Sequence, residues 1–349
     1  MPDRRASGSP LTIAAPSGST GRPLDPAGTR DRLASALLAN GPVRVVERVA
    51  GSPLDAAAWR DLADDSSAIL VIRSDDDRSP GWEPPGPIVR NRAGRAVPVG
   101  LLWGGQIAAA AAAADTLADR SATGPSGAGP VALLGPGRGR ARDVFDAVEA
   151  SWARSTRVAA PIRWTAERLG WEELRAGLGA GLGAALYLGH GTPDAWPAYG
   201  GLTPERLRDA VRAPGGEPMG AMLALTCNGA GRDVHAERGS FAGRLVSEVV
   251  AGSVLAAVGL VDHAVDRHLA HATLAAIAGG ARTMGDVLVA AASDPRLADR
   301  LGPYRILGDP RTSIVGPAAA WDRARTVRAA GPSDPVAPAT GRWPSSIGI

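Results

Sequence analysis

Two residues with reactive side chains follow short apolar segments in the second half of the chain. Residues 184–188, AALYL, run into a Gly-His-Gly triplet centred on His190, and residues 219–226, MGAMLALT, run into Cys227. Runs of this kind are typical of buried strands. Because the carboxyl ends of parallel strands meet at one edge of a sheet, we expect His190 and Cys227 to lie over the same crevice.

An imidazole beside a thiol is the arrangement that a cysteine nucleophile needs. A free thiol has a pKa of about 8.5, so it is mostly protonated at neutral pH, and a neighbouring imidazole helps to form the thiolate. The same imidazole can then protonate a leaving amine. The backbone N–H groups of Gly191 and Cys227 are predicted to bind the oxyanion. Taken singly, the two motifs are also typical of a buried thiol and of a simple turn.

The chain that must position these residues has the composition of a globular protein. It has 349 residues, of which 45% are hydrophobic and 21% are charged. Its 45 glycines and 29 prolines indicate many loops, but fewer than in a wholly disordered chain. The single cysteine excludes a disulfide framework.

The charge pattern argues against a nucleic-acid partner. All 38 basic residues are arginine, and with 9 Trp against 2 Phe this indicates a GC-rich coding sequence. A net charge of +3 over the whole chain is a weak signal for a polyanion partner. No stretch has the length of a membrane span or the apolar core of a signal peptide, so we expect no membrane contact and a cytoplasmic location.

Strand and helix signals alternate between two loose ends, which predicts an α/β fold with a mostly parallel sheet flanked by helices. Residues 304–307 and 312–315 are predicted to close the fold as a hairpin. A Gly/Ser-rich stretch, residues 121–130, indicates a linker between two subdomains. The predicted units are a disordered tail (1–35), an N-terminal α/β subdomain (36–128), a catalytic subdomain (129–316) and a Pro/Ala-rich tail (317–349).

The motifs resemble those of caspase-hemoglobinase (clan CD) cysteine peptidases, and of the gingipain family in particular. The matching blocks are residues 188–191 (LGHG) with Trp196 beyond them, residues 226–229 (TCNG) and residues 306–310 (ILGDP). Residues 74–76 and 99–102 resemble the family more faintly. The resemblance spans about residues 36–316. The related CHAT-domain peptidases resemble the same fold and dyad and are a near alternative.

The resemblance implies a thiol endopeptidase that acts on a protein or peptide substrate. Cys227 would be the nucleophile and His190 the general acid and base, with no metal and no cofactor. Thr226 stands where the family usually has Ser or Ala, and Leu101 where it usually has Arg. No acidic residue in the second half is evident as the group that orients His190. The alternative is a catalytically inactive caspase-like module that binds a protein partner. The sequence carries no sign of the oligomeric state.

Substrate preference is predicted from three residues near the expected crevice. Asp262 follows the predicted strand at residues 253–258 and could pair with a basic side chain before the scissile bond. It could equally cap the helix that starts at His263. Asp194 could also bind substrate, or bond to the backbone of its own turn. Trp196 is the third predicted substrate-binding residue.

Three further motifs are interpreted as structural. Residues 232–239 (RDVHAERG) are predicted to be a surface loop, with a processing or gating loop as the alternative. His268 and His271 lie about one helical turn apart, with His263 and Asp266 nearby, an arrangement that is more typical of a solvated helix face than of a metal site. Residues 135–140 (GPGRGR) lack the residues of a phosphate-binding loop and are predicted to form a turn.

Overall fold

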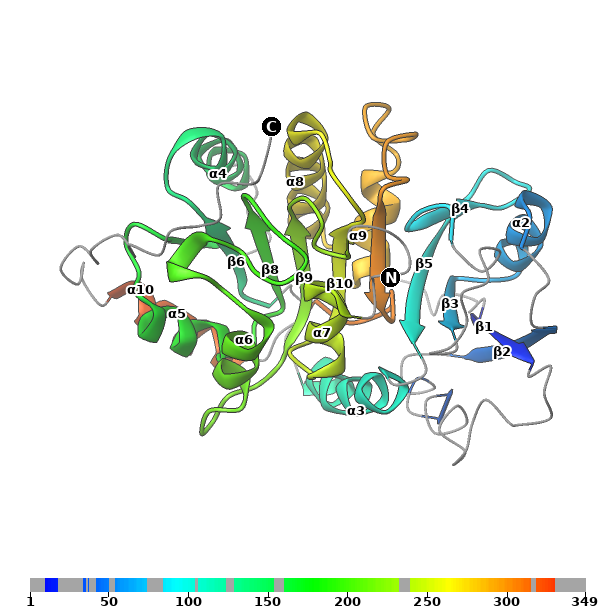
Figure 1. Ribbon diagram of the computed structural model, residues 1–349, viewed down its shortest axis with the longest axis horizontal. Helices are drawn as coiled ribbons and strands as arrows, with labels where there is room; N and C mark the ends of the chain where they lie inside the picture. The colour runs from blue at the N-terminus through cyan, green and yellow to red at the C-terminus, as the bar shows by residue number, and fades with distance from the viewer. Residues whose placement is uncertain are drawn as a thin grey trace, which may run out of the picture.

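A single 11-stranded sheet runs through the middle of the molecule, in the order β2-β1-β3-β5-β11-β10-β9-β8-β6-β7 with β4 beside β5 (Figure 1). The computed structural model describes residues 10–17, 34, 35, 37, 42–49, 54–73, 84–103, 106–123, 129–153, 160–231, 239–314 and 318–329. The strands are β1 (Leu11–Ser17), β2 (Val43–Val49), β3 (Ala68–Arg73), β4 (Ile88–Arg90), β5 (Ala96–Trp103), β6 (Val131–Gly135), β7 (Ile162–Thr165), β8 (Ala184–Leu188), β9 (Met219–Leu225), β10 (Ala251–Ala257) and β11 (Tyr304–Gly308). The predicted α/β fold with a mostly parallel sheet is confirmed.

The sheet consists of two parallel blocks that run in opposite directions. β11 pairs in parallel with β5 but antiparallel with β10. The strands β1, β2, β3, β5 and β11 therefore end at one edge of the sheet, and β6 to β10 end at the other. Because chemistry in such sheets gathers beyond the carboxyl ends of the strands, only the second block contributes strand ends to the edge that carries His190 and Cys227.

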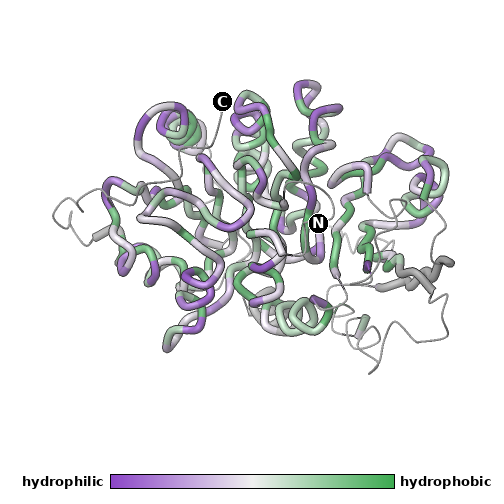
Figure 2. The backbone as a smooth tube through the Cα atoms, in the orientation of Figure 1, coloured by the Kyte–Doolittle hydropathy of each residue, from purple (hydrophilic) through white to green (hydrophobic). Residues whose placement is uncertain are grey.

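Helices cover both faces of the second block. The described helices are α2 (Ala56–Asp64), α3 (Ile107–Thr123), α4 (Gly139–Trp152), α5 (Trp171–Leu178), α6 (Pro204–Val211), α7 (Phe241–Ser247), α8 (His263–Ala278), α9 (Met284–Ala291) and α10 (Ala318–Ala329), with one short 3-10 turn, η3 (Ala198–Gly200). One core lies beneath α4, α8 and α9, and the other beneath α3, α5, α6, α7 and α10. Hydrophobic residues concentrate in the central strands, and polar residues on the outer turns (Figure 2).

Side chains alternate between these two cores along each strand. In β8, Leu186 and Leu188 pack toward α4 and α8, whereas Ala185 and Tyr187 pack toward the opposite helices. All five residues of β8 are buried, which is why its sequence reads as a continuous apolar run.

Three sequence predictions about the ends of the chain are wrong. Leu11–Ser17, placed in the disordered tail, forms β1 between β2 and β3, because Leu11 and Ile13 are apolar enough to be fully buried. Ala318–Ala329, placed in the loose C-terminal tail, forms α10, with Ala320, Ala324 and Val327 buried. The closing hairpin does not form, because β11 pairs with β10 and β5, and Ser313 bridges to Thr283 instead of to β11.

The subdomain boundary at residues 128 and 129 stays a prediction. β11 comes from the second predicted subdomain and pairs with β5 of the first, so one sheet joins the two parts. Among the described residues, no helix has the length and apolar character of a membrane span.

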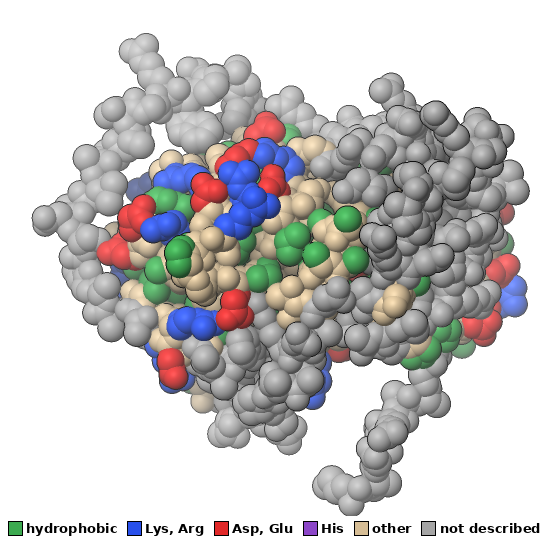
Figure 3. Space-filling model, turned by 90° about the horizontal axis from the view of Figure 1, so that it is seen from below, with side chains coloured by type: hydrophobic (Ala, Val, Ile, Leu, Met, Phe, Trp, Pro, Cys, Tyr) green, Lys and Arg blue, Asp and Glu red, His purple; other side chains and the backbone are tan. Residues whose placement is uncertain are grey.

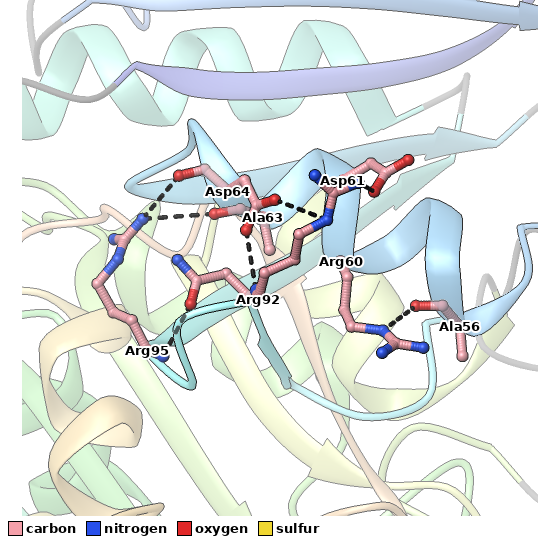
Figure 4. A network of polar contacts seen from close by, with 8 residues as sticks. Ala56, Arg60, Asp61, Ala63, Asp64, Arg92 and Arg95 are labelled. Atoms are coloured by element: carbon pink, nitrogen blue, oxygen red, sulfur yellow. Dashed lines mark hydrogen bonds and ion pairs between the residues drawn. The ribbon is translucent and has the colours of Figure 1, made fainter.

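In the first block, a polar network joins α2 to the turn between β4 and β5 (Figure 4). The Arg92 guanidinium donates to Asp61 at 2.6 Å, and the Arg92 N–H donates to Asp64 at 2.8 Å. The Arg95 guanidinium donates to the carbonyl oxygen of Ala63 at 3.4 Å. These mostly exposed contacts fix the turn and belong to a part of the fold away from His190 and Cys227.

Candidate active site

His190 and Cys227 follow neighbouring strands of the second block. β8 ends at Leu188 and β9 at Leu225, and these two residues face each other in the parallel register. Each reactive residue stands two positions beyond its strand. Neighbouring strands lie about 4.8 Å apart, so both residues leave the sheet at the same edge. The two loops thus meet as the sequence predicts, while the catalytic roles stay predictions.

Gly191 is the point at which the two loops touch. A Cβ built on Gly191 would lie 2.3 Å from Thr226 Oγ1 and 3.1 Å from the carbonyl oxygen of Cys227. The N–H of Gly189 donates to the carbonyl oxygen of Leu225 at 3.5 Å. A side chain at Gly191 would therefore push the His190 loop away from the Cys227 loop.

The Cys227 loop is tied to the loop that precedes α8. Cys227 is half-buried, and its Sγ lies 3.9 Å from the carbonyl oxygen of Val261. Asn228 has a left-handed backbone (φ 58°), and its N–H donates to the carbonyl oxygen of Gly259 at 2.7 Å. Asparagine tolerates this conformation better than most residues. The tight turn leaves the thiol at the sheet edge.

Two backbone N–H groups at this edge have no hydrogen-bond acceptor within the described part of the chain and could bind a ligand oxygen. Among the described residues, no carbonyl accepts from the N–H of Gly191 or of Cys227, whereas those of Thr226 and Asn228 are both engaged. An oxygen bound by such donors gains charge stabilisation without reorganisation of the protein. The same two groups are the predicted oxyanion donors.

Comparison with known proteins gives a likeness of fold. No family model matches the sequence, and no curated protein matches it. A solved structure described as a protease superposes with a TM-score of 0.59 at 12% identity, covering 88% of this chain and 78% of that one. The Arg-specific cysteine proteinase gingipain R superposes at 0.57 and 14% identity (87% and 78%). A complex of the Porphyromonas gingivalis RgpB pro- and mature domains superposes at 0.55 and 13% identity (87% and 80%).

The chain has a gingipain-like fold. The caspase-like α/β architecture expected from the residue blocks is therefore confirmed. One of those blocks lies away from the dyad, because Gly308 pairs with Ser253 near the start of β10, at the opposite edge from Cys227. There Asp309 is buried, accepting from the Arg311 N–H at 2.8 Å. In this gingipain-like fold the Gly-Asp-Pro block closes a turn.

An aromatic stack supports the His190 loop from one face of the sheet. Tyr187 donates to the His190 carbonyl oxygen at 3.1 Å, and burial raises the pKa of its phenol. The Tyr187 and Trp196 rings stack at 4.0 Å, and Trp196 stacks on Phe241 at 4.2 Å. Trp196 is fully buried between these two rings, so its packing supports the loop. The substrate contact predicted for Trp196 stays a prediction.

The two predicted substrate-binding carboxylates lie on loops beside the dyad. Asp262 caps α8 by accepting from the Ala264 N–H at 2.8 Å, and its other oxygen pairs with Arg300 at 3.0 Å. The cap and Arg300 lower the pKa of Asp262. Asp194 is exposed in a turn whose backbone N–H groups bond to the Thr192 hydroxyl. The capping alternative for Asp262 is confirmed, and a substrate role for either residue stays a prediction.

The sequence offered His263 and Asp266 only as part of a possible metal cluster, and did not predict that this histidine and buried acid lie beside the dyad. The rings of His190 and His263 meet edge to face, with centroids 5.9 Å apart. Asp266, one turn further along α8, is 1% exposed and accepts from the Tyr304 hydroxyl at 2.7 Å. The available signal was an acid at a position where Val265, Leu269 and the rest of that helix face are apolar.

The remaining motifs carry no described ligand site. The side chain of Glu167 binds to the glycine-rich turn at residues 135–140: it accepts from the Gly137 N–H at 2.5 Å and pairs with Arg138 at 3.7 Å. No group of three His, Cys, Asp or Glu among the described residues could hold a metal ion. Residues 232–238, with His235 and Glu237, lie outside the described residues.

Charged side chains of both signs lie side by side on the face of the molecule seen from below (Figure 3). On α6 and α7, Arg244 pairs with Glu205, and beyond α7 Glu248 pairs with Arg208 at 3.7 Å and Arg212 at 3.5 Å. This mixture differs from the one-signed surface that binds a polyanion.

Proposed function

We propose that this protein is a cysteine endopeptidase that uses a His190–Cys227 dyad. The observation that carries the proposal is the contact of the two loops at Gly191, which brings the chain's only thiol and an imidazole to one edge of the sheet. The gingipain-like fold supports the same reaction class, since gingipain R is itself a cysteine proteinase.

The reaction proceeds through a thioester. His190 takes the Cys227 proton, and Sγ attacks the carbonyl carbon of the scissile peptide bond. The N–H groups of Gly191 and Cys227 bind the oxyanion that forms. His190 then protonates the amine as the C–N bond breaks. A water molecule, deprotonated by His190, hydrolyses the thioester and restores the thiol.

We extend the proposal to a preference for a basic residue before the scissile bond. Asp194 is exposed and has a carboxylate available to a guanidinium, whereas Asp262 would have to exchange Arg300 for the substrate. Asp194→Asn should therefore lower kcat/KM for an arginine substrate more than for a leucine substrate. Asp262→Asn serves as the comparison, with a smaller change in that ratio.

The dyad is tested by cleavage of a fluorogenic peptide library. Cys227→Ala should abolish cleavage, and His190→Ala should lower kcat by about 10²–10⁴-fold. His271→Ala is the matched control, because His271 lies eight residues, about 12 Å, along α8 from His263. Full cleavage by the Cys227→Ala protein would overturn the proposal. A wild-type protein that cleaves nothing, with a Cys227 indifferent to His190→Ala, would instead favour the partner-binding module.

The protein or peptide substrate and the cytoplasmic location belong to this proposal. Neither a metal nor an organic cofactor takes part in the steps above.

A further inference from the structure

His263 lies against the proposed general base, at the first position of a capped helix. Its ring meets that of His190 at an interplanar angle of 85°. His263 is the first residue of α8, whose first turn is fixed by Asp262: the Ala264 N–H bonds to its carboxylate, and the N–H groups of Val265 and Asp266 bond to its carbonyl oxygen. The backbone from which the His263 ring projects is therefore set by a capped helix end.

A buried carboxylate faces His263 from the same helix. Asp266 Oδ1 accepts from the Tyr304 hydroxyl at 2.7 Å. Asp266 Oδ2 accepts no hydrogen bond from any described residue and lies 4.0 Å from Nδ1 of His263. A buried carboxylate oxygen without a partner destabilises a fold, so its presence calls for a reason other than packing.

Tyr304 links this carboxylate to the thiol side of the site. It pairs with Ala257 at the end of β10 and is fully buried. Burial and the Asp266 charge raise the pKa of Tyr304, and the charge of a Cys227 thiolate adds to this effect. The phenol thus stays protonated as a donor to Asp266, close enough to Cys227 to sense its charge.

Charged and titratable groups from several elements surround His263 and Asp266. Asp262, on the turn before α8, is paired with Arg300 from the loop before β11. His190 and Cys227 approach from the β8 and β9 loops. Neither α4 nor α9, which pack on α8, contributes a described ion pair to His263 or Asp266. Burial raises the pKa of Asp266 to about 6, the Tyr304 hydrogen bond opposes this, and the Asp262 charge adds to it.

We propose that His263 is a positioning residue for His190, and that the buried Asp266 in turn orients His263 through its unpartnered oxygen. This inference rests on the proposed dyad and supplies the acid that the dyad otherwise lacks. Through His263, Asp266 fixes the orientation in which His190 exchanges a proton with the Cys227 thiol and with the leaving amine.

The test is the pH dependence of Cys227 alkylation by iodoacetamide, measured beside kcat and KM for peptide cleavage. Asp266→Asn removes the charge and keeps an acceptor for Tyr304. His263→Phe keeps a ring edge against His190 and breaks the link to Asp266. Both should lower kcat about 10–100-fold with KM little changed, and Asp266→Asn should move the alkylation profile to higher pH, because His190 then gives the Cys227 thiolate less support. The double variant should lose no more than the worse single variant.

His271→Phe on the same helix is the matched control and should leave the profile unchanged. Thermal melting of each variant confirms that it is folded. Unmoved alkylation profiles in Asp266→Asn and His263→Phe, or losses that multiply in the double variant, would overturn the inference. If these two variants behave as wild type while His190→Ala slows alkylation, the dyad stands and only the inference fails. If His190→Ala has no effect either, the proposed function fails as well.

Discussion

The two faces of the sheet reach the His190–Cys227 edge with different chemistry. On one face Tyr187, Trp196 and Phe241 form an apolar stack. The Tyr187 hydroxyl of this stack donates a hydrogen bond to the His190 carbonyl oxygen. On the other face Asp266 and Tyr304 form a buried polar pair beneath His263. Both groups are equally shielded from water, so burial alone does not distinguish them.

The aromatic stack stabilises the site, whereas the Asp266–Tyr304 pair sets its pH dependence. Stacked aromatic rings gain free energy from burial and fix the loop without charge. A buried carboxylate lowers the stability of the fold at neutral pH, and such groups concentrate at functional sites. Substitutions on the aromatic face should therefore act mainly on stability, and those on the polar face mainly on pH dependence.

Trp196→Ala should have the largest effect on stability. It leaves a cavity between Tyr187 and Phe241, and large-to-small changes of this kind lower the free energy of unfolding by about 3–5 kcal/mol. Urea unfolding measures the change, and Trp196→Phe is the control with a smaller loss. A loss below about 1 kcal/mol in Trp196→Ala would show that the stack does not hold this edge together.

Gly191→Ala should push the His190 loop and the Cys227 loop apart. The new Cβ meets the Thr226 hydroxyl, and overpacking of this kind destabilises by about 1–3 kcal/mol. The dyad geometry should suffer more, with a loss of about 100-fold in kcat/KM. Gly139→Ala offers a control, because nothing lies within 4 Å of a Cβ there, although its positive φ of 58° adds backbone strain. Wild-type cleavage by Gly191→Ala would contradict the close contact.

Asp266→Asn should raise stability at neutral pH, the opposite sign to the aromatic variants. The pKa of Asp266 is about 6 in the folded chain, against about 3.9 for an unfolded aspartate. The folded state therefore binds more protons between these values, and the free energy of unfolding falls as pH rises from about 4 to 6. The variant lacks this fall and should be more stable above pH 6 by roughly 3 kcal/mol.

Urea titrations at pH 4.5 and 7.5 measure this difference between wild type and Asp266→Asn. The gain should be present at pH 7.5 and mostly absent at pH 4.5. An equal change at both pH values would assign Asp266 an ordinary packing role.

Tyr187→Phe should have the smallest effect. It keeps the ring on Trp196 and removes the hydroxyl that donates to the His190 carbonyl oxygen. The loss of one neutral hydrogen bond lowers stability by about 1 kcal/mol, with a small drop in kcat from a looser loop. A shift in the alkylation pH profile would contradict the assignment of charge effects to the other face.

Much of the site was predictable because its signals are local. The buried strands at residues 184–188 (AALYL) and 222–226 (MLALT) can be recognised as apolar runs, and His190 and Cys227 follow them within two positions. The cap at Asp262 was one of two alternatives and depends only on the next residues of α8. The stacking of Trp196 was not predictable in the same way, because its partner Phe241 lies 45 positions further along the chain.

The errors fall on features that depend on distant partners. Leu11–Ser17 is a short segment with little internal pattern, and it becomes a strand because β2 and β3 flank it. β11 was expected to pair with its neighbour in sequence and pairs instead with β10 and β5. Strand pairing is a long-range choice that no local pattern encodes.

The sequence by itself determined which residue types follow the buried strands and so named His190, Gly191 and Cys227. Only the tertiary structure decided that the two blocks of the sheet run in opposite directions, which leaves the first block's strand ends away from the dyad. Only the tertiary structure buried the Asp266 carboxylate and gave it the Tyr304 hydroxyl as a donor, because Tyr304 lies on β11, 38 positions further along the chain. The type of residue that follows a strand can be read from adjacent positions, whereas the burial and ionisation of a side chain depend on elements far away in the sequence.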